Sequence, residues 1–465
     1  MRATRAPIAS RIINSVAASR RTRQGGARFH PQLFVAIAAV GLALLLVGEH
    51  SLSQAAEAPG ALLIRDLGCP VCHEIAGHET TVRQEAPDLT FEGDRVRAHW
   101  LFSFLKKPHS VRPALRARMP DFRLSDEEAL AVTEYLLTLN DSQAQPLEAS
   151  DRFTGTVTPA NLEAAKRLMS EEYFDCFSCH LYGDRRPEGS REEWAPDLSK
   201  VHSRLNPDWV ARWLRDPSKI VPRTKMPTYF EDEDSGPDDI LDGDEAAQIV
   251  ALRDYLMSRG RAQEAPGYQQ AKVEFPEVTA ARGRSLIVKL NCVGCHRIAG
   301  LPRGKRIGPP LSFQGSRVRR EWLQSFLKRP GTIKPEYEIM GSGARMPDFR
   351  LSDAEVQTLT DYIMTRLVDR TLPSLPAEAI PRTLAARGKQ LFRKKYCDNC
   401  HRIGSRPGGI GPDLSEAWKR LNPAWVYRFV LNPSHYLETR MPDLRLTEAE
   451  AKAITAHLVH LREVP

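Results

Sequence analysis

The chain of 465 residues is long enough for three or four domains, and its composition of 42% hydrophobic and 27% charged residues is that of an ordinary globular protein. The formal net charge of +8 comes mostly from the first 55 residues, which hold seven arginines and one glutamate, so the rest of the chain has a net charge of only +2. This distribution excludes a large basic nucleic-acid surface on the body of the protein, and we expect no nucleic-acid partner.

The basic N-terminal segment leads into a 16-residue apolar run from Leu33 to Gly48. Such a run is short for a membrane span and is typical of the central region of a signal peptide. Small residues suited to cleavage follow at Ala55 and Ala58. Because the basic head is unusually long, an uncleaved membrane anchor through residues 33–48 is the alternative. We predict a signal peptide or membrane anchor over residues 1–56.

All 8 cysteines lie in four copies of the motif C-x-x-C-H. Zinc would need two further ligands close to each motif, and a redox dithiol would not need the histidine each time. Two thiols three residues apart can reach both vinyl groups of one porphyrin, and the next histidine can face its iron. The motif therefore predicts four covalently attached haems c at Cys69, Cys72 and His73, Cys176, Cys179 and His180, Cys292, Cys295 and His296, and Cys397, Cys400 and His401.

The four motifs mark four repeats, for which we predict domains over residues 57–142, 158–260, 276–370 and 382–465. Each repeat should begin with a helix. A glycine stands nine residues before the first cysteine at Gly60, Gly283 and Gly388, whereas repeat 2 has Arg167 there. Glycine inside a helix costs about 1 kcal/mol relative to alanine, so its recurrence indicates close approach of a second helix.

The second part of each repeat follows a common order. It contains a proline loop, an arginine and a tryptophan before an expected middle helix, and a basic residue followed by Met-Pro. An S/T-x-x-E capping box then opens a last helix in repeats 1, 3 and 4, with Tyr135, Tyr362 or His457 sixteen residues after the methionine. Repeat 2 instead has an acidic insert at 231–245, expected to be a solvated loop. The repeated residues are Pro87, Pro196, Pro309 and Pro412, then Arg95, Arg204, Arg317 and Arg420, then Trp100, Trp209, Trp322 and Trp425.

In this order of elements each repeat resembles a class I, mitochondrial-type cytochrome c domain. The resemblance implies an all-α fold of four tandem haem domains after the N-terminal segment. It implies proximal iron ligands at His73, His180, His296 and His401, and distal ligands at Met119, Met226, Met346 and Met441. It also implies that each loop proline carbonyl accepts a hydrogen bond from the histidine Nδ1–H. The repeated arginine would pair with a haem propionate or face solvent.

The function implied by the resemblance is electron transfer in the periplasm rather than catalysis, because both axial positions of every iron would be filled. The donor would be a quinol-oxidising complex or a dehydrogenase, and the acceptor a small cytochrome, an oxidase or a reductase. A haem subunit of a membrane respiratory complex is the first alternative. A haem oxidoreductase or peroxidase is the second, and would need an iron without its methionine. The arginine-rich head would also suit a mitochondrial transit peptide, but four tandem haem domains favour bacterial export.

Overall fold

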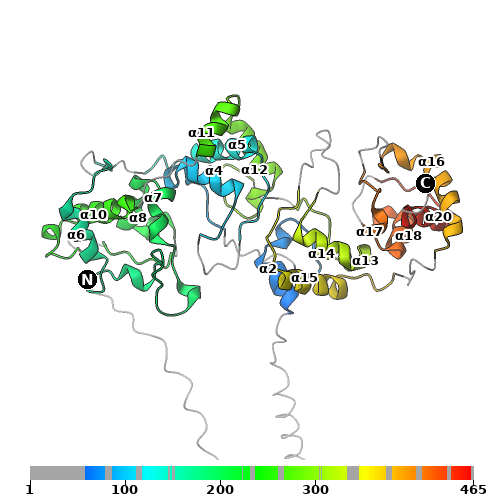
Figure 1. Ribbon diagram of the computed structural model, residues 1–465, viewed down its shortest axis with the longest axis horizontal. Coiled ribbons are helices and arrows are strands. Elements are labelled where there is room, and N and C mark those ends of the chain that lie inside the picture. Colours follow the sequence, from blue (N-terminus) through cyan, green and yellow to red (C-terminus); the bar gives the residue numbers. More distant parts are fainter. Residues whose placement is uncertain are drawn as a thin grey trace, which may run out of the picture. The chain divides into compact units, whose positions relative to one another are not determined.

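The computed structural model describes residues 58–78, 86–111, 118–144, 147–148, 152–222, 224–230, 236–259, 266–302, 304, 306–331, 345–372, 380–404, 411–436 and 441–461 (Figure 1). Residues 58–465 form one compact unit. The predicted signal or anchor segment, the methionine-loop residues 112–117, 332–344 and 437–440, and residues 231–235 of the acidic insert lie outside the described residues. None of the described helices is long and apolar enough to cross a membrane.

The described part of the chain is helical, with isolated β-bridges and no strand, which confirms the all-α expectation. Every repeat supplies a helix before its haem motif, a short helix, a middle helix and a last helix. In that order, repeat 1 has α2(Pro59–Asp66), α3(Glu92–Arg95), α4(Ala98–Lys106) and α5(Asp126–Leu137), and repeat 2 has α6(Pro159–Leu168), α7(Val201–Arg204), α8(Pro207–Arg215) and α10(Glu245–Ser258). Repeat 3 has α12(Ala280–Lys289), α13(Gln314–Arg317), α14(Arg320–Lys328) and α15(Asp353–Arg366), and repeat 4 has α16(Ala385–Lys394), α17(Ala417–Arg420), α18(Pro423–Leu431) and α20(Glu448–Val459).

Shorter additions complete the element list. They are α9(Pro217–Ile220), α11(Pro266–Glu274) and α19(Pro433–Tyr436), together with short 3₁₀ helices at Arg191–Glu193, Leu198–Lys200, Leu241–Gly243 and Arg382–Leu384. The three predicted capping boxes are present, at Ser125 with Glu128, Ser352 with Glu355, and Thr447 with Glu450. In repeat 2 the helix α10 is capped instead by Asp244, whose side chain accepts from the Ala247 N–H.

Repeats 2 and 4 each fold as a contiguous module in which the first helix packs on the last. These pairs are α6 with α10 and α16 with α20. In repeat 4 a Cβ at Gly388 would overlap the carbonyl oxygen of Ala453 and lie 2.8 Å from the Cβ of His457. The predicted close approach of two helices at this glycine is therefore confirmed.

Repeats 1 and 3 differ from the contiguous arrangement expected from their boundaries, because they exchange their first halves. The helix α2 of repeat 1 packs on α15 of repeat 3, and α12 of repeat 3 packs on α5 of repeat 1. Figure 1 shows the blue α2 beside the yellow α15, and α12 beside α5. We call residues 58–78 with 306–372 module A, and residues 86–144 with 266–302 module B.

The exchange has a physical reason in the likeness of the two repeats. Gly60 lies against the Tyr362 side chain, and Gly283 lies against the Ala131 carbonyl and the Tyr135 side chain. On both last helices a tyrosine and a backbone carbonyl leave no room for a Cβ, and both first helices place a glycine there. Either first helix can pack on either last helix with the same kind of contact. The helix pattern alone therefore does not determine which first helix packs on which last helix.

The pH dependence of stability should be strongest in repeat 4, where His457 replaces the tyrosine. Its Nδ1 is buried without a hydrogen-bond partner. Burial, with Lys389 and Arg393 nearby, lowers its pKa to about 4. The pKa in the unfolded chain is about 6.5, so on acidification the unfolded state takes up the proton first. The contribution of neutral His457 to the free energy of unfolding is therefore fully present above about pH 6.5 and is lost as the pH falls toward 4.

We expect His457→Tyr, which gives the residue of repeats 1 and 3, to remove this loss. Between pH 7 and pH 4.5 the variant should gain about 1–3 kcal/mol relative to the parent protein. Urea unfolding followed by circular dichroism at both pH values measures the difference. A difference that is the same at both pH values would contradict the assigned role of His457.

Candidate haem-attachment sites

Each haem motif lies on a tight turn that follows the first helix directly. The residue before the first cysteine has a left-handed backbone, with φ of 69° at Gly68, 43° at Asp175, 61° at Asn291 and 57° at Tyr396. A short 3₁₀ turn follows, at Cys69–Val71, Cys176–Ser178, Cys292–Gly294 and Cys397–Asn399. The histidine N–H then donates to the first cysteine carbonyl, at 2.9–3.0 Å in all four motifs. This geometry brings two thiols and one imidazole together on a single turn.

Every motif histidine is oriented by a proline carbonyl, as the resemblance implied. The Nδ1–O distances are 2.8 Å from His73 to Pro309, 2.8 Å from His180 to Pro196, 2.9 Å from His296 to Pro87, and 2.9 Å from His401 to Pro412. Because a carbonyl only accepts, Nδ1 carries the proton and Nε2 carries the lone pair that can bind iron. In modules A and B the proline belongs to the other repeat.

The ionisation of the motif side chains suits thioether attachment and iron ligation. Burial lowers the pKa of His73, His296 and His401, which keeps these rings neutral. Burial raises the pKa of Cys69, Cys176 and Cys292 to about 12. Reactive dithiols and zinc ligands need a stabilised thiolate, and these surroundings favour the protonated thiol. The sites therefore resemble apolar pockets for a porphyrin edge rather than dithiol or zinc centres.

Three of the four predicted methionine ligands pack against the core that holds a haem motif. Met346 and Cys69 pack against one hydrophobic core, which also takes Met441 and Cys397, and Met119 packs with Cys292 against another. In repeat 2 the Trp213 Nε1–H donates to the Met226 sulfur at 2.9 Å. The repeated tryptophan stacks on the residue four positions later, which is Phe104, Phe326 and Phe429 in the other repeats and Trp213 only here.

The repeated arginines lie at contacts between modules, which sequence reasoning missed. Arg204 lies over the Trp100 ring and Arg317 over the Trp425 ring, both 5.1 Å from the ring centroid. The neighbouring backbones form short antiparallel bridges, Val96 with Leu205 and Val318 with Leu421. The sequence feature that accompanies these contacts is a basic or amide residue two positions after each arginine: Arg97, Asn206, Arg319 and Asn422. Their backbone N–H groups donate across these bridges at 2.9–3.0 Å.

The buried charge at one of these contacts fits a haem c with its two propionates. Arg317 Nε is buried without a hydrogen-bond partner. Burial and the like charge of Arg420 lower the pKa of Arg317 to about 10. Both side chains are half-buried and Arg420 has Asp413 nearby, so a further anion beside Arg317 would offset its desolvation. The propionate carboxylates of bound haem would supply that anion, so the residues present fit the group.

Comparison with known families agrees with this geometry. Residues 57–140 and 280–366 match the family model for cytochrome c. The chain therefore contains cytochrome c domains. Residues 383–458 match the model described as cytochrome c oxidase, cbb3-type, subunit III. No curated protein and no solved structure matches the chain.

These cytochrome c domains establish the general biochemistry of the chain. Four C-x-x-C-H motifs in a multidomain c-type cytochrome mean four covalently bound haems c and an electron-transfer function with redox proteins as partners. Cytochromes of this type are extracytoplasmic proteins. Neither family model covers repeat 2, which departs most from the common pattern.

Repeat 2 replaces the recurrent glycine contact with a polar one. Arg167 pairs with the Asp239 carboxylate, and Tyr173 donates to the same carboxylate at 2.7 Å. Asp239 belongs to the acidic insert. The buried Gln248 of α10 holds this insert further by donating to the Ile240 carbonyl at 2.8 Å. The described part of the insert is thus attached to its module, which differs from the solvated loop that its composition predicted.

If Met226 ligates the repeat 2 haem, the hydrogen bond from Trp213 should raise the reduction potential of that haem, because it draws electron density from the Met226 sulfur. We expect Trp213→Phe to lower that potential by up to about 40 mV, which for one electron corresponds to a hydrogen bond of about 1 kcal/mol. A redox titration followed by haem absorbance measures the shift. Met257→Leu, at a buried methionine of α10 in the same repeat, is the control and should leave the titration unchanged. An equal shift in both variants would exclude the role of the Trp213 donor.

Proposed function

We propose that the protein is a periplasmic electron carrier that passes electrons through four His/Met-ligated haems between a respiratory donor and acceptor. The observation that carries this proposal is the hydrogen bond from each motif histidine to a proline carbonyl, which assigns the proton to Nδ1 and the iron-binding lone pair to Nε2. The distal ligands are Met119, Met226, Met346 and Met441. With both axial positions filled, no iron keeps a position for a substrate, and the thioether ligand raises the reduction potential.

Contacts between modules support a route for these electrons. Repeat 2 meets module B through the Val96–Leu205 bridge, module A meets repeat 4 through the Val318–Leu421 bridge, and modules A and B meet through their methionine loops. Each haem-binding module therefore has a neighbour in direct contact. Electrons would move between haems of adjoining modules rather than through solution.

The partners follow from the family. The donor is a quinol-oxidising complex or a dehydrogenase, and the acceptor is a small cytochrome, an oxidase or a reductase. If residues 33–48 are retained, they anchor the protein to the inner membrane; if they are removed, the protein is soluble. Purification of the native protein from solubilised membranes, followed by identification of its companions, distinguishes a free carrier from a complex subunit.

A second candidate function is supported by repeat 4. Its match to the subunit III model of cbb3-type cytochrome c oxidase favours a haem subunit of a membrane respiratory complex. In that case repeat 4 would be the module that faces the terminal partner. A native complex that retains this protein with oxidase subunits through gel filtration would support this candidate.

Ligation can be tested with carbon monoxide, which binds reduced haem iron only where an axial position is open. We expect little binding to the parent protein and about one equivalent to Met441→Ala, whose repeat 4 haem should also fall in potential through loss of the thioether. Met257→Leu, a methionine buried in α10, is the control.

Two results would contradict the proposal. Rapid stoichiometric binding of carbon monoxide to the parent protein would favour an enzyme with an open haem. A Met441→Ala variant that behaves like the parent would mean that another residue, with His435 the next candidate, occupies the distal position.

A further inference from the structure

We propose that repeats 1 and 3 complete each other's haem sites, so that Met346 ligates the haem attached at Cys69 and Cys72, and Met119 ligates the haem attached at Cys292 and Cys295. This proposal rests on the methionine ligation proposed above. It assigns each methionine to a haem motif more than 170 residues away in the chain, instead of to the motif of its own repeat.

The first support is the packing of the two exchanged helices. Ile64 of α2, 1% exposed, shares its core with Leu359 and Ile363 of α15. Ile287 of α12, also 1% exposed, shares its core with Leu130 of α5. The first helices are thus buried in the modules that contain the other repeat's methionine. Around the exchanged helix α12, Arg282 pairs with Glu127 at the surface.

The second support is that the exchanged contacts match those of a contiguous module. In repeat 4 the Gly411 N–H donates to the Cys400 carbonyl and the Leu414 N–H to the Arg402 carbonyl, at 2.8 and 2.9 Å. Module A makes the same two bonds at 2.8 Å each, but from Gly308 to Cys72 and from Leu311 to Glu74. Module B repeats the second bond, from Leu89 to Arg297 at 2.9 Å. The proline loop of one repeat therefore makes the same kind of backbone hydrogen bonds to the haem motif of the other repeat that repeat 4 makes within itself.

The third support is the position of the methionines themselves. Met346 packs against the same core as Cys69, and Met119 against the same core as Cys292. Neither methionine packs against the core that takes the cysteine of its own repeat. The haem that faces each methionine is therefore the one attached through the exchanged motif.

The two methionine loops also hold each other directly. The sequence Arg-Met-Pro-Asp-Phe-Arg-Leu-Ser-Asp occurs at 118–126 and again at 345–353. The two copies pair antiparallel, with N–H groups and carbonyls of Asp121 and Asp348 exchanging bonds of 2.7 and 2.8 Å. Arg123 donates to the Met346 carbonyl and Arg350 to the Met119 carbonyl, both at 3.1 Å. Each predicted ligand loop is thus fixed by an arginine of the other copy.

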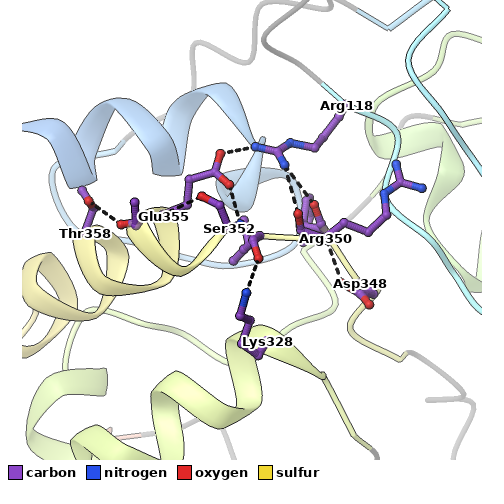
Figure 2. A network of polar contacts seen from close by, with 10 residues as sticks. Arg118, Lys328, Asp348, Arg350, Ser352, Glu355 and Thr358 are labelled. Carbon is purple, nitrogen blue, oxygen red and sulfur yellow. Dashed lines mark hydrogen bonds and ion pairs between the residues drawn. The ribbon is translucent and has the colours of Figure 1, made fainter.

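Ion pairs at the helix starts complete this reciprocal contact, which we call the methionine-loop clasp. Figure 2 shows Arg118 reaching Glu355, the capping glutamate of α15, beside Ser352 and Arg350. In the opposite direction Arg345 binds Glu128, the capping glutamate of α5, with both carboxylate oxygens 2.6 Å away. Burial raises the pKa of Glu128, but the hydrogen bond and the charge of Arg345 lower it. The pKa of this carboxyl is on balance below its ordinary value. In repeat 4 the same glutamate, Glu450, pairs with Lys395 of its own module.

The haem motifs of the two modules meet as well. The buried Asn291 donates to the Val71 carbonyl at 3.4 Å and lies 3.5 Å from the Cys72 sulfur. A Cβ at Gly294 would overlap the Val71 side chain, so glycine is required there. The two haem attachment turns are therefore in contact, so haems attached to them would lie near each other.

The assignment can be tested in the full chain with variants that carry three haems. In Cys292→Ser/Cys295→Ser the repeat 3 haem is absent, which leaves Met119 without an iron if the exchange is correct. We expect Met346→Ala in this background to bind one further equivalent of carbon monoxide after reduction, and Met119→Ala to bind none. In the reciprocal Cys69→Ser/Cys72→Ser background, Met119→Ala should open a haem and Met346→Ala should not.

The opposite pattern in both backgrounds would overturn the proposal and assign each methionine to its own repeat. If neither methionine opens a haem, the crosswise assignment also fails. The Met441→Ala variant in the same background then distinguishes failure of the crosswise assignment from failure of methionine ligation in general. If it binds carbon monoxide at the repeat 4 haem, His/Met ligation still holds there; if it does not, the proposed methionine ligation fails too. Haem content by mass spectrometry establishes that each background holds three haems.

A second measurement needs no loss of haem. A protease site inserted between Arg259 and Pro266 allows the four-haem protein to be cut into two fragments after folding. Since α2 and α12 would each be buried in the other fragment's module, the fragments should stay together in high salt and separate only in denaturant. Fragments that separate in high salt with their haems and helices intact would overturn the exchange, because only the ion pairs of the clasp would then have held them.

Discussion

The hydrogen bond from a motif histidine to a proline carbonyl is the interaction on which the rest of this structure depends. It fixes the ring tautomer and direction, and it joins the half of a module that carries the haem motif to the half that carries the methionine. Burial keeps His73, His296 and His401 neutral, and the left-handed residue before each motif turns the chain so that the ring reaches its proline. The bond requires only a carbonyl in the right place, so the proline can come from any repeat that folds alike.

Sequence reasoning predicted the local features well because each has a local cause. The motif, the capping boxes and the recurrent glycine are determined by residues within one turn or one helix contact, and they occur as expected. The exchange could not be predicted, since Gly60 and Gly283 meet equivalent tyrosines, Tyr362 and Tyr135. The arginine contacts between modules were missed for the same reason: Arg204 and Arg317 stack on tryptophans of other repeats, and a repeat read alone leaves them facing solvent or haem.

The buried arginines link cofactor loading to assembly of the modules. Arg317 and Arg420 approach each other where module A meets repeat 4, and their like charges oppose burial. Carboxylates placed between them would convert this repulsion into attraction in a region of low dielectric, where charged pairs interact strongly. The contact between these modules should therefore tighten when haem is attached, which would align the electron route only in the matured protein.

Differences among the repeats matter because four haems of equal reduction potential would give an electron no preference for any one of them. Repeat 2 has lost the helix-crossing glycine, gained an acidic insert bound through Asp239, and placed an N–H donor on its methionine sulfur. Each change stays within its own module and leaves the histidine–proline bond intact. Modules A and B are instead joined by the reciprocal contacts of the clasp. The chain thus combines a closely matched central pair with outer modules whose potentials can diverge, an arrangement that allows direction along the route without altering any haem motif.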